Sequence, residues 1–312
     1  MSPANPHVNE AVGRRSMKYY IFDWDDNILH MPTKICLEHL RADGTWEPVE
    51  VSTATFALIR ADTEHYRPPT EGGWRAAFRN FADEPDCNHF LDDTRAALER
   101  IEQGEKPGPS FETLKKTLRE GRIFAIVTAR GHASETIEQA VRLFIEKALT
   151  AEERDEMMAN LRGYRKCFDH VTEFGTDAEE LNYYLGMCSY AAVTNSDFRE
   201  QMACDPIYRR KLDTSPRTHA PELAKEYAIR DFVERIFHML RRTGGLNRPV
   251  AIGFSDDDKG NVARVSNYIQ SELSRRFGGI KFVVYDTSDS SLSKGRKVCV
   301  VCQETLPGFS FD

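Results

Sequence analysis

The sequence predicts an α/β fold in which a parallel sheet lies between two layers of helices. Short apolar runs that favour strands alternate along the chain with longer segments of helical periodicity. Three of these runs also end in acidic or hydroxyl side chains, and the carboxyl edge of such a sheet is where binding sites form. The predicted strands begin near residues 18, 122, 168, 249 and 280.

The composition sets bounds on the class of protein. The chain has 312 residues, of which 40% are hydrophobic and 29% charged, enough for one sizeable core and an accessory domain. The formal charge of −7 argues against a general binder of nucleic acid or membrane surfaces, because such proteins present a basic face. No apolar run reaches 18 residues, and the seven cysteines are scattered. We therefore expect a soluble, cytoplasmic protein without a membrane partner.

The first predicted strand organises the rest of the chain. Residues 1–16 lack periodicity and are expected to form a flexible tail. The apolar and aromatic residues 19–22 then lead directly into Asp23 and Asp25. Where a strand opens into a loop, both carboxylates are able to face one cavity, and a hard cation such as Mg²⁺ relieves their repulsion. A solvated turn is the competing interpretation.

A long insertion follows this strand. Extended segments on either side of Asp43 and Gly44 predict a hairpin that could act as a flap beside the site. From 53 to 102 the apolar spacing becomes helical. We expect residues 31–105 to form a flap and helical cap insertion. Aromatic residues at helical spacings are more often part of a core than a platform for substrate.

A second unit of strand, turn and helix comes next. After a linker and a short helix, residues 122–128 form an apolar run that ends in Thr128, and an amphipathic helix is predicted over 134–147. Arg130 and His132 lie just before this helix, whose free N–H groups favour anions. These two side chains are therefore candidate substrate contacts, and an exposed loop is the alternative.

The middle of the chain is less regular. A helix is expected over 150–164, and residues 167–172 are predicted to form the third strand. The segment 173–220 contains scattered Gly and Pro and one strand-like run at 190–194. Its length predicts a second insertion or small cap.

A lysine near the start of a long helix is the next candidate. The pattern predicts a helix over 220–243, with Lys225 in or near its first turn. A cation there opposes the helix dipole, which invites a functional explanation, although solvation alone would suffice. Lys211 and Lys259 are the alternatives to Lys225.

A last apolar run ends in three consecutive acids. Residues 249–255 predict a buried strand that leads into Asp256, Asp257 and Asp258, whose repulsion would be severe without a cation or basic group nearby. An exposed acidic turn is the alternative. A helix over 262–277 and a strand over 280–286 are expected to follow.

The carboxyl-terminal residues 291–312 are rich in Ser and Gly at their start and are expected to form a tail, with a short closing strand at 298–301. Cys299 and Cys302 form a single Cys-x-x-Cys pair. A structural zinc site needs about four ligands, so this pair does not predict one by itself.

Four of these motifs resemble those of the haloacid dehalogenase superfamily of phosphohydrolases. They occur in the family's order: Asp23 with Asp25 after the first strand, Thr128 after the second, then Lys225, then Asp256 and Asp257. Asn27 departs from the family pattern, which has Thr or Val there. The resemblance implies a three-layer Rossmann-like core with helical cap insertions, built from residues 17–30, 106–172 and 221–290.

The resemblance also implies a mechanism. Asp23 would attack phosphorus and form an aspartyl-phosphate, while Asp25 would act as general acid and then general base. Thr128 and Lys225 would stabilise the phosphoryl oxygens, with Arg130 as a further substrate contact. Mg²⁺ would be held by Asp23, by the backbone carbonyl of Asp25 and by one of Asp256 or Asp257. The sequence thus predicts a Mg²⁺-dependent phosphatase that acts on a small-molecule phosphomonoester.

Two other functions remain open at this point. A binding or regulatory protein that keeps the fold without turnover would be consistent with Asn27 and with the large insertions. A nucleic-acid end phosphatase or nucleotidase is disfavoured by the acidic balance of the chain. The motifs specify neither the substrate nor the oligomeric state, since specificity would come from the insertions 31–105 and 173–220.

Overall fold

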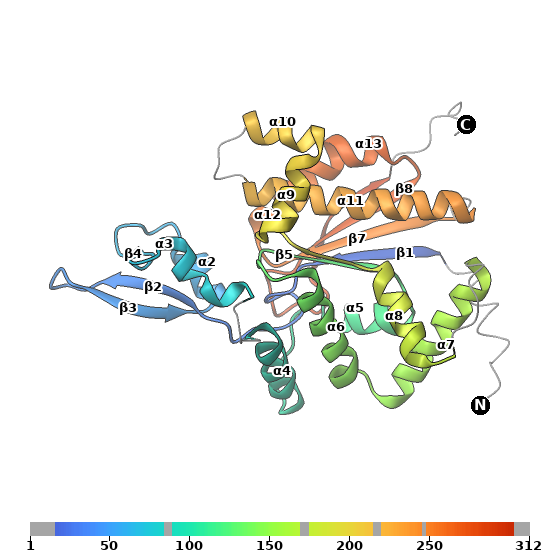
Figure 1. The fold of residues 1–312 in the computed structure, drawn as a ribbon, viewed down its shortest axis with the longest axis horizontal. Coiled ribbons are helices and arrows are strands. Elements are labelled where there is room, and N and C mark those ends of the chain that lie inside the picture. The colour runs from blue at the N-terminus through green and yellow to red at the C-terminus, as the bar shows by residue number, and fades with distance from the viewer. Residues whose placement is uncertain (1–15, 84–88, 169–174, 215–219, 245–247, 303–312) are drawn as a thin grey trace.

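The computed structural model describes residues 16–83, 89–168, 175–214, 220–244 and 248–302. A six-stranded sheet with the order β6-β5-β1-β7-β8-β9 lies between two layers of helices (Figure 1). All its neighbouring strands pair in parallel except β8 and β9, which are antiparallel. The predicted α/β class is confirmed. The strands are β1 Met17–Phe22, β5 Phe124–Thr128, β6 Ser189–Ala192, β7 Val250–Asp256, β8 Ile280–Asp286 and β9 Arg296–Cys302.

Side chains of β1 enter both halves of the core. Tyr19 and Ile21 belong to a buried cluster on one face of the sheet, whereas Phe22 belongs to a second cluster on the other face. This follows from the alternation of side chains along a strand. Because helices cover both faces of the sheet, its strands are nearly continuous apolar runs in the sequence, and they could be recognised for this reason.

Each face of the sheet has its own layer of helices (Figure 1). On the first face lie α9 Ser196–Cys204, α10 Pro206–Thr214, α11 Ala220–Thr243, α12 Lys259–Tyr268 and, after the single π turn Ile269–Leu273, α13 Ser274–Arg276. On the second lie α4 His89–Glu102, α5 Phe111–Arg119, α6 Ser134–Ala148, α7 Ala151–Phe168 and α8 Asp177–Met187. None of the helices in the described ranges is long and apolar enough to cross a lipid bilayer.

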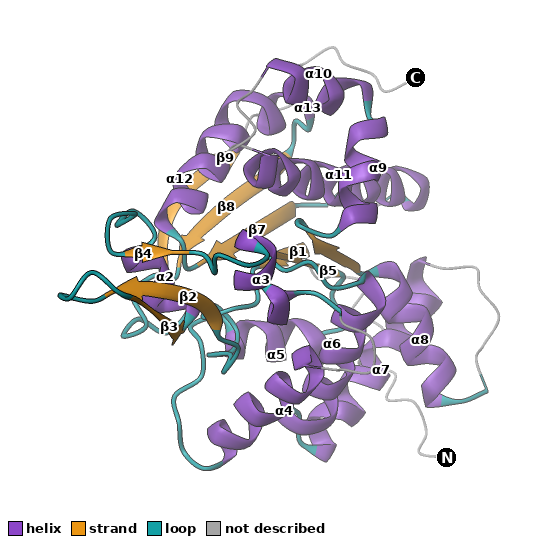
Figure 2. Cartoon of the chain, turned by 60° about the vertical axis from the view of Figure 1, so that its left-hand side comes forward, coloured by secondary structure: helices purple, strands orange, loops and turns teal. Residues whose placement is uncertain are grey.

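A small separate module stands beside the carboxyl edge of the sheet (Figure 2). It has its own antiparallel sheet in the order β3-β2-β4 and its own apolar cluster, centred on Leu37, Ala77 and Phe81. The predicted hairpin is confirmed, and Gly44 at its tip has φ +83°, a conformation that favours glycine. The module consists of β2 Ile35–Leu40, β3 Trp46–Val51, α2 Thr53–Ile59, β4 Tyr66–Arg67, α3 Gly73–Ala77 and the 3₁₀ turn Arg79–Phe81.

The predicted third strand at 167–172 is wrong where the structure describes it. Helix α7 runs on through Phe168, and residues 169–172 lie outside the described ranges. Apolar positions such as Met157, Met158 and Leu161 continue the helical face of α7 against the core. A short run such as Cys167-Phe168 does not by itself distinguish the end of a helix from a strand.

The two predicted insertions also differ from what the structure shows. The described part of the predicted insertion 173–220 does not form a separate small cap, because β6 is an edge strand of the central sheet and Met202 and Tyr208 belong to the main core. The last helix of the expected cap, α4, packs through Phe90 and Leu98 into the same cluster as α6. Only the first part of the predicted insertion stands apart from the core.

Candidate active site

Two acids from distant parts of the chain meet at the carboxyl edge of the sheet. Strands β1 and β7 pair in parallel with Phe22 opposite Ser255, and the N–H of Asp23 donates to the carbonyl of Ser255 at 3.0 Å. Asp23 and Asp256 therefore leave neighbouring strands at the same level. Both side chains are buried, with exposures of 7% and 1%.

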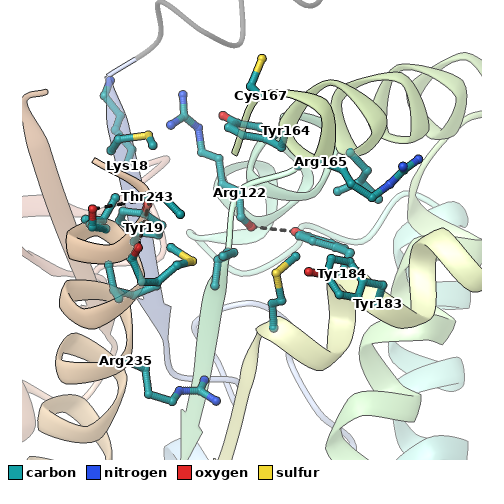
Figure 3. A pocket seen from close by; sticks show the side chains of 18 of the residues that line it. Lys18, Tyr19, Arg122, Tyr164, Arg165, Cys167, Tyr183, Tyr184, Arg235 and Thr243 are labelled. Atoms are coloured by element: carbon teal, nitrogen blue, oxygen red, sulfur yellow. Dashed lines mark hydrogen bonds between the residues drawn. The ribbon is translucent and has the colours of Figure 1, made fainter. Parts of the chain in front are cut away.

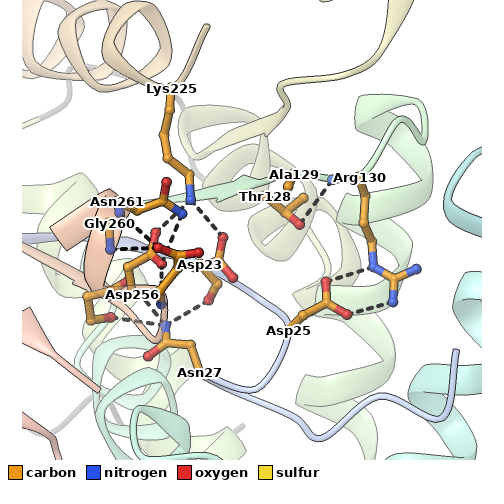
Figure 4. A network of polar contacts seen from close by, with 12 residues as sticks. Asp23, Asp25, Asn27, Thr128, Ala129, Arg130, Lys225, Asp256, Gly260 and Asn261 are labelled. Atoms are coloured by element: carbon orange, nitrogen blue, oxygen red, sulfur yellow. Dashed lines mark hydrogen bonds and ion pairs between the residues drawn. The ribbon is translucent and has the colours of Figure 1, made fainter. Parts of the chain in front are cut away.

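Lys225 joins these two acids. Its Nζ lies 3.2 Å from Oδ1 of Asp23 and 2.6 Å from Oδ2 of Asp256 (Figure 4). Of the three lysines considered from the sequence, Lys225 is the one beside Asp23, since Lys211 contacts Glu226 and Glu272 and Lys259 is exposed at the start of α12. The unfavourable position of Lys225 early in α11 is thus offset by two carboxylates.

The three consecutive acids after β7 have different surroundings. The second oxygen of Asp256 accepts from the N–H of Asp258 at 2.9 Å and from Nδ2 of Asn261 at 3.3 Å. Asp258 is the N-cap of α12, and its Oδ1 accepts from the N–H groups of Gly260 and Asn261 at 2.7 and 3.1 Å. Asp258 therefore has a structural role, while Asp256 and Asp257 remain available to the site.

The acids are crowded enough to shift their protonation. Burial raises the pKa of Asp23 to about 8, with Lys225 opposing the shift and Asp256 adding to it. Burial together with Asp23 and Asp256 raises the pKa of Asp257 to about 9. Although burial works against its charge, the carboxylates of Asp256 and Asp23 hold the pKa of Lys225 above its usual value. Three carboxylates thus compete for one ammonium group.

Asn27 holds the loop that carries Asp23. Its Nδ2 donates to the carbonyl of Asp23 at 2.8 Å and lies 3.1 Å from Oγ of Ser255. Its Oδ1 accepts from the hydroxyls of Ser110 at 2.7 Å and Thr287 at 2.8 Å. Asn27 is fully buried, so its side chain serves to fix this loop.

Sequence reasoning did not find the three hydroxyls around Asn27. Ser110 precedes the first residue of α5, yet its side chain makes no capping bond and donates to Asn27 instead. Ser255 and Thr287 each stand at the carboxyl end of a strand, next to an acid. Polar residues beside strand ends were the signal that could have identified them.

The second acid of the first motif faces away from this cluster. Figure 4 shows Asp25 beside Arg130 and apart from Asp23, with Thr128 between the two groups. Nε and Nη2 of Arg130 donate to the two oxygens of Asp25 at 2.8 and 2.7 Å, which is a bidentate ion pair. The guanidinium that was a candidate substrate contact is therefore engaged by a carboxylate in this structure.

Thr128 and His132 are two further polar residues near this edge. Thr128 ends β5, is 1% exposed, and its hydroxyl accepts weakly from the N–H of Arg130 at 3.4 Å. His132 is also 1% exposed and stacks on Phe90 with ring centroids 4.8 Å apart. Burial and the charge of Arg130 lower the pKa of His132 to about 4, so its ring is neutral at pH 7.

Two contacts join helix α2 of the module and the residue after it to the site. The hydroxyl of Thr53 donates to Oδ2 of Asp26 at 2.6 Å, and Arg60 forms an ion pair with Asp258 at 3.2 Å. Asp26 itself has φ +53° in the tight turn after β1. These contacts hold α2 next to the loops that carry the acids.

The donor set suits a hard divalent cation. Carboxylate oxygens are the ligands Mg²⁺ prefers, and the raised pKa values of Asp23 and Asp257 indicate that Lys225 alone does not keep all three acids at 23, 256 and 257 ionised. Within the described residues no three acidic, His or Cys side chains already surround a common point. In this arrangement Asp23 and Asp256 both point to the ammonium of Lys225 instead.

A cavity of about 800 Å³ lies at the other edge of the sheet, between α7, α8 and α11 (Figure 3). It is bordered by Tyr19 at the start of β1 and by Arg165, which pairs with Glu180. None of the predicted catalytic or metal-binding residues lines it.

Comparisons of the chain with protein-family models, with curated proteins and with solved structures give no match. The functional assignment therefore rests on the residues at the carboxyl edge and on their chemistry.

Proposed function

We propose that the protein is a Mg²⁺-dependent phosphomonoesterase of the haloacid dehalogenase type. The observation that supports this most directly is the cluster of Asp23, Lys225 and Asp256. A carboxylate at a strand end, held by a buried lysine and set beside further acids, suits a nucleophile that must approach a phosphate dianion.

The first half of the proposed reaction forms a covalent intermediate. An oxygen of Asp23 attacks phosphorus, a new bond forms between that oxygen and phosphorus, and the bond to the leaving oxygen breaks. Asp25 carries its proton on a lone pair that Arg130 leaves free and gives it to that leaving oxygen, so the product departs as an alcohol. The ammonium of Lys225 and the hydroxyl of Thr128 stabilise the charge on the remaining phosphoryl oxygens.

The second half releases phosphate. Asp25, now ionised, takes a proton from water as the water oxygen attacks the phosphorus of the aspartyl-phosphate. The bond between Asp23 and phosphorus breaks, inorganic phosphate leaves, and both acids return to their starting states. Bound Mg²⁺, held by Asp23, the carbonyl of Asp25 and Asp256 or Asp257, would supply the positive charge that brings carboxylate and phosphate together.

The test is a hydrolysis assay combined with trapping. Initial rates with 4-nitrophenyl phosphate are measured with Mg²⁺ and with EDTA, and rapidly quenched protein is analysed for one added phosphoryl group on the peptide that contains Asp23. We expect Mg²⁺-dependent turnover and a transient label that Asp23→Asn abolishes.

A protein that binds vanadate or phosphate in the presence of Mg²⁺ but hydrolyses none of a broad panel of phosphate esters would contradict the proposal. That result would favour a binding or regulatory protein with the same fold.

A further inference from the structure

The side chain of Arg130 makes more contacts within the protein than we expect of a residue that binds substrate. It is 1% exposed, and besides its two bonds to Asp25, Nη2 donates to the hydroxyl of Thr33 at 2.8 Å. The remaining nitrogen, Nη1, is buried, has no hydrogen-bond partner among the described residues and points away from Asp25 (Figure 4). The edge of the guanidinium formed by Nε and Nη2 therefore faces Asp25.

Apart from Asp25, the contacts on the Arg130 guanidinium within the described residues come from the segment between β1 and β5. The guanidinium lies 4.6 Å from the ring centre of Phe81 in the module and 4.7 Å from that of Phe90 in α4. Such contacts stabilise a guanidinium most where they exclude water. Thr33 in turn donates its hydroxyl to Asp93 of α4.

We propose that Arg130 is a positioning residue for Asp25, and that the segment between β1 and β5 completes the candidate active site by clamping the Arg130 guanidinium between Phe81 and Phe90. This rests on the proposed function, in which Asp25 moves protons. A carboxylate held at both oxygens has one orientation, whereas a free aspartate has several. A misplacement of about 1 Å in a reacting group can cost about 10²-fold in rate.

The choice of leaving group separates this role from a general effect on the fold. 4-Nitrophenolate leaves readily without a proton, whereas the phenolate of phenyl phosphate benefits from one. The two esters have nearly the same shape. A residue that orients the proton donor matters more for phenyl phosphate, and a residue that only supports the fold affects both esters equally.

The experiment compares kcat and KM for both esters in full-length wild type, Arg130→Gln and Arg130→Lys. We expect Arg130→Gln to lower kcat/KM for phenyl phosphate by about 10²-fold and for 4-nitrophenyl phosphate by less than about 5-fold. The comparison uses kcat/KM, which covers the steps up to phosphoryl transfer to Asp23, because hydrolysis of the aspartyl-phosphate also uses Asp25 and is common to both esters. Arg130→Lys should recover part of the loss, because one ammonium holds one oxygen of Asp25 at a time. In an Asp25→Asn background, Arg130→Gln should add little.

Two further variants keep the test decisive if Arg130→Gln folds poorly. Phe81→Leu and Phe90→Leu retain the guanidinium but remove a ring that flanks it, and each should give a smaller loss with the same preference for 4-nitrophenyl phosphate. The matched control is Arg165→Gln, which removes a buried bidentate arginine near the opposite edge. It should leave the ratio of the two rates unchanged in the folded protein.

The outcomes are distinguishable. If wild type hydrolyses neither ester and no label appears on Asp23, the proposed function is wrong and this inference is overturned with it. If wild type is active but the Arg130 and Phe variants lower kcat/KM equally for both esters, the proposed function stands and the positioning role does not.

Discussion

Two buried clusters of charge lie near opposite edges of the central sheet and differ in their balance. At the carboxyl edge, Lys225 contacts Asp23 and Asp256 while Asp257 crowds the same space. At the amino edge, Arg165 donates three hydrogen bonds of 2.6 to 3.1 Å to Glu180. A paired guanidinium and carboxylate need no further ligand. A surplus of buried carboxylates lowers stability, and functional sites are where such a cost is commonly retained.

The largest expected effect is on turnover. Asp23→Asn should lower the hydrolysis rate by at least about 10³-fold, because the attacking carboxylate is lost. It should leave the free energy of unfolding unchanged or higher, since it removes one of several crowded acids. Glu180→Gln should leave turnover normal but lower the free energy of unfolding by about 3–5 kcal/mol, because Arg165 is left buried without its carboxylate.

Initial rates and chemical unfolding curves for both variants check this contrast. A Glu180→Gln protein that is folded yet as inactive as Asp23→Asn would show that the two clusters do not differ in function.

The next effect concerns the lysine. Lys225→Met leaves two buried carboxylates without their ammonium and should cost about 3–5 kcal/mol of stability as well as activity. Adding Asp256→Asn to Lys225→Met should restore much of the stability and none of the activity. Urea unfolding of the single and double variants measures this. Equal stability of wild type and Lys225→Met would contradict the proposed balance of charge.

The pH dependence of stability tests whether the buried ring of His132 is neutral in the folded protein. The pKa of His132 is lowered from 6.5 to about 4 by burial and by Arg130, with His89 acting in the same direction and Asp83 opposing. Its unfolded form therefore takes up a proton first, and stability should fall as pH drops from about 6.5 toward 4, by up to about 1.4 kcal/mol per unit. In His132→Phe this part of the pH dependence should disappear. Unfolding curves between pH 7 and 5 test it, and an unchanged slope would assign the loss to other groups.

The smallest expected effect is stabilisation by the metal. Mg²⁺ at several times its Kd should raise the free energy of unfolding by about 1 kcal/mol, because it binds the crowded acids of the folded state. Asp257→Asn should weaken this response, and Glu180→Gln should keep it. Thermal unfolding with MgCl₂, against NaCl of equal ionic strength, is the measurement. An equal shift in wild type and in the Asp23→Asn, Asp257→Asn double variant would place the ion elsewhere.

Much of the fold could be predicted because its strands are buried on both faces. The runs at 124–128, 250–256 and 280–286 are apolar almost throughout, and such runs need no knowledge of their neighbours to be recognised. The end of α7 at Phe168 and the integration of β6 into the sheet depend on tertiary packing, which a local pattern does not contain.

The residues of the candidate site also fall into those that the sequence predicts and those that it does not. The residues at strand ends, Asp23, Thr128 and Asp256, were found from the sequence because a strand end is a local feature. The partners of Asp25 and Asn27 were not, since Arg130, Ser110 and Thr287 reach them only through the fold. The roles of all these residues in catalysis, and the involvement of Mg²⁺, remain predictions for the experiments above.

The position of Asn27 has a consequence for how this molecule is made. Thr287, one of the hydroxyls that hold it, lies 260 residues further along the polypeptide. During synthesis the ribosome completes the loop with the first acids long before it adds the last residue that fixes that loop. The nascent chain therefore passes most of its elongation before all the hydrogen bonds of Asn27 are made, and shortening it before residue 287 should leave the sheet largely formed but Asn27 held only by its other partners.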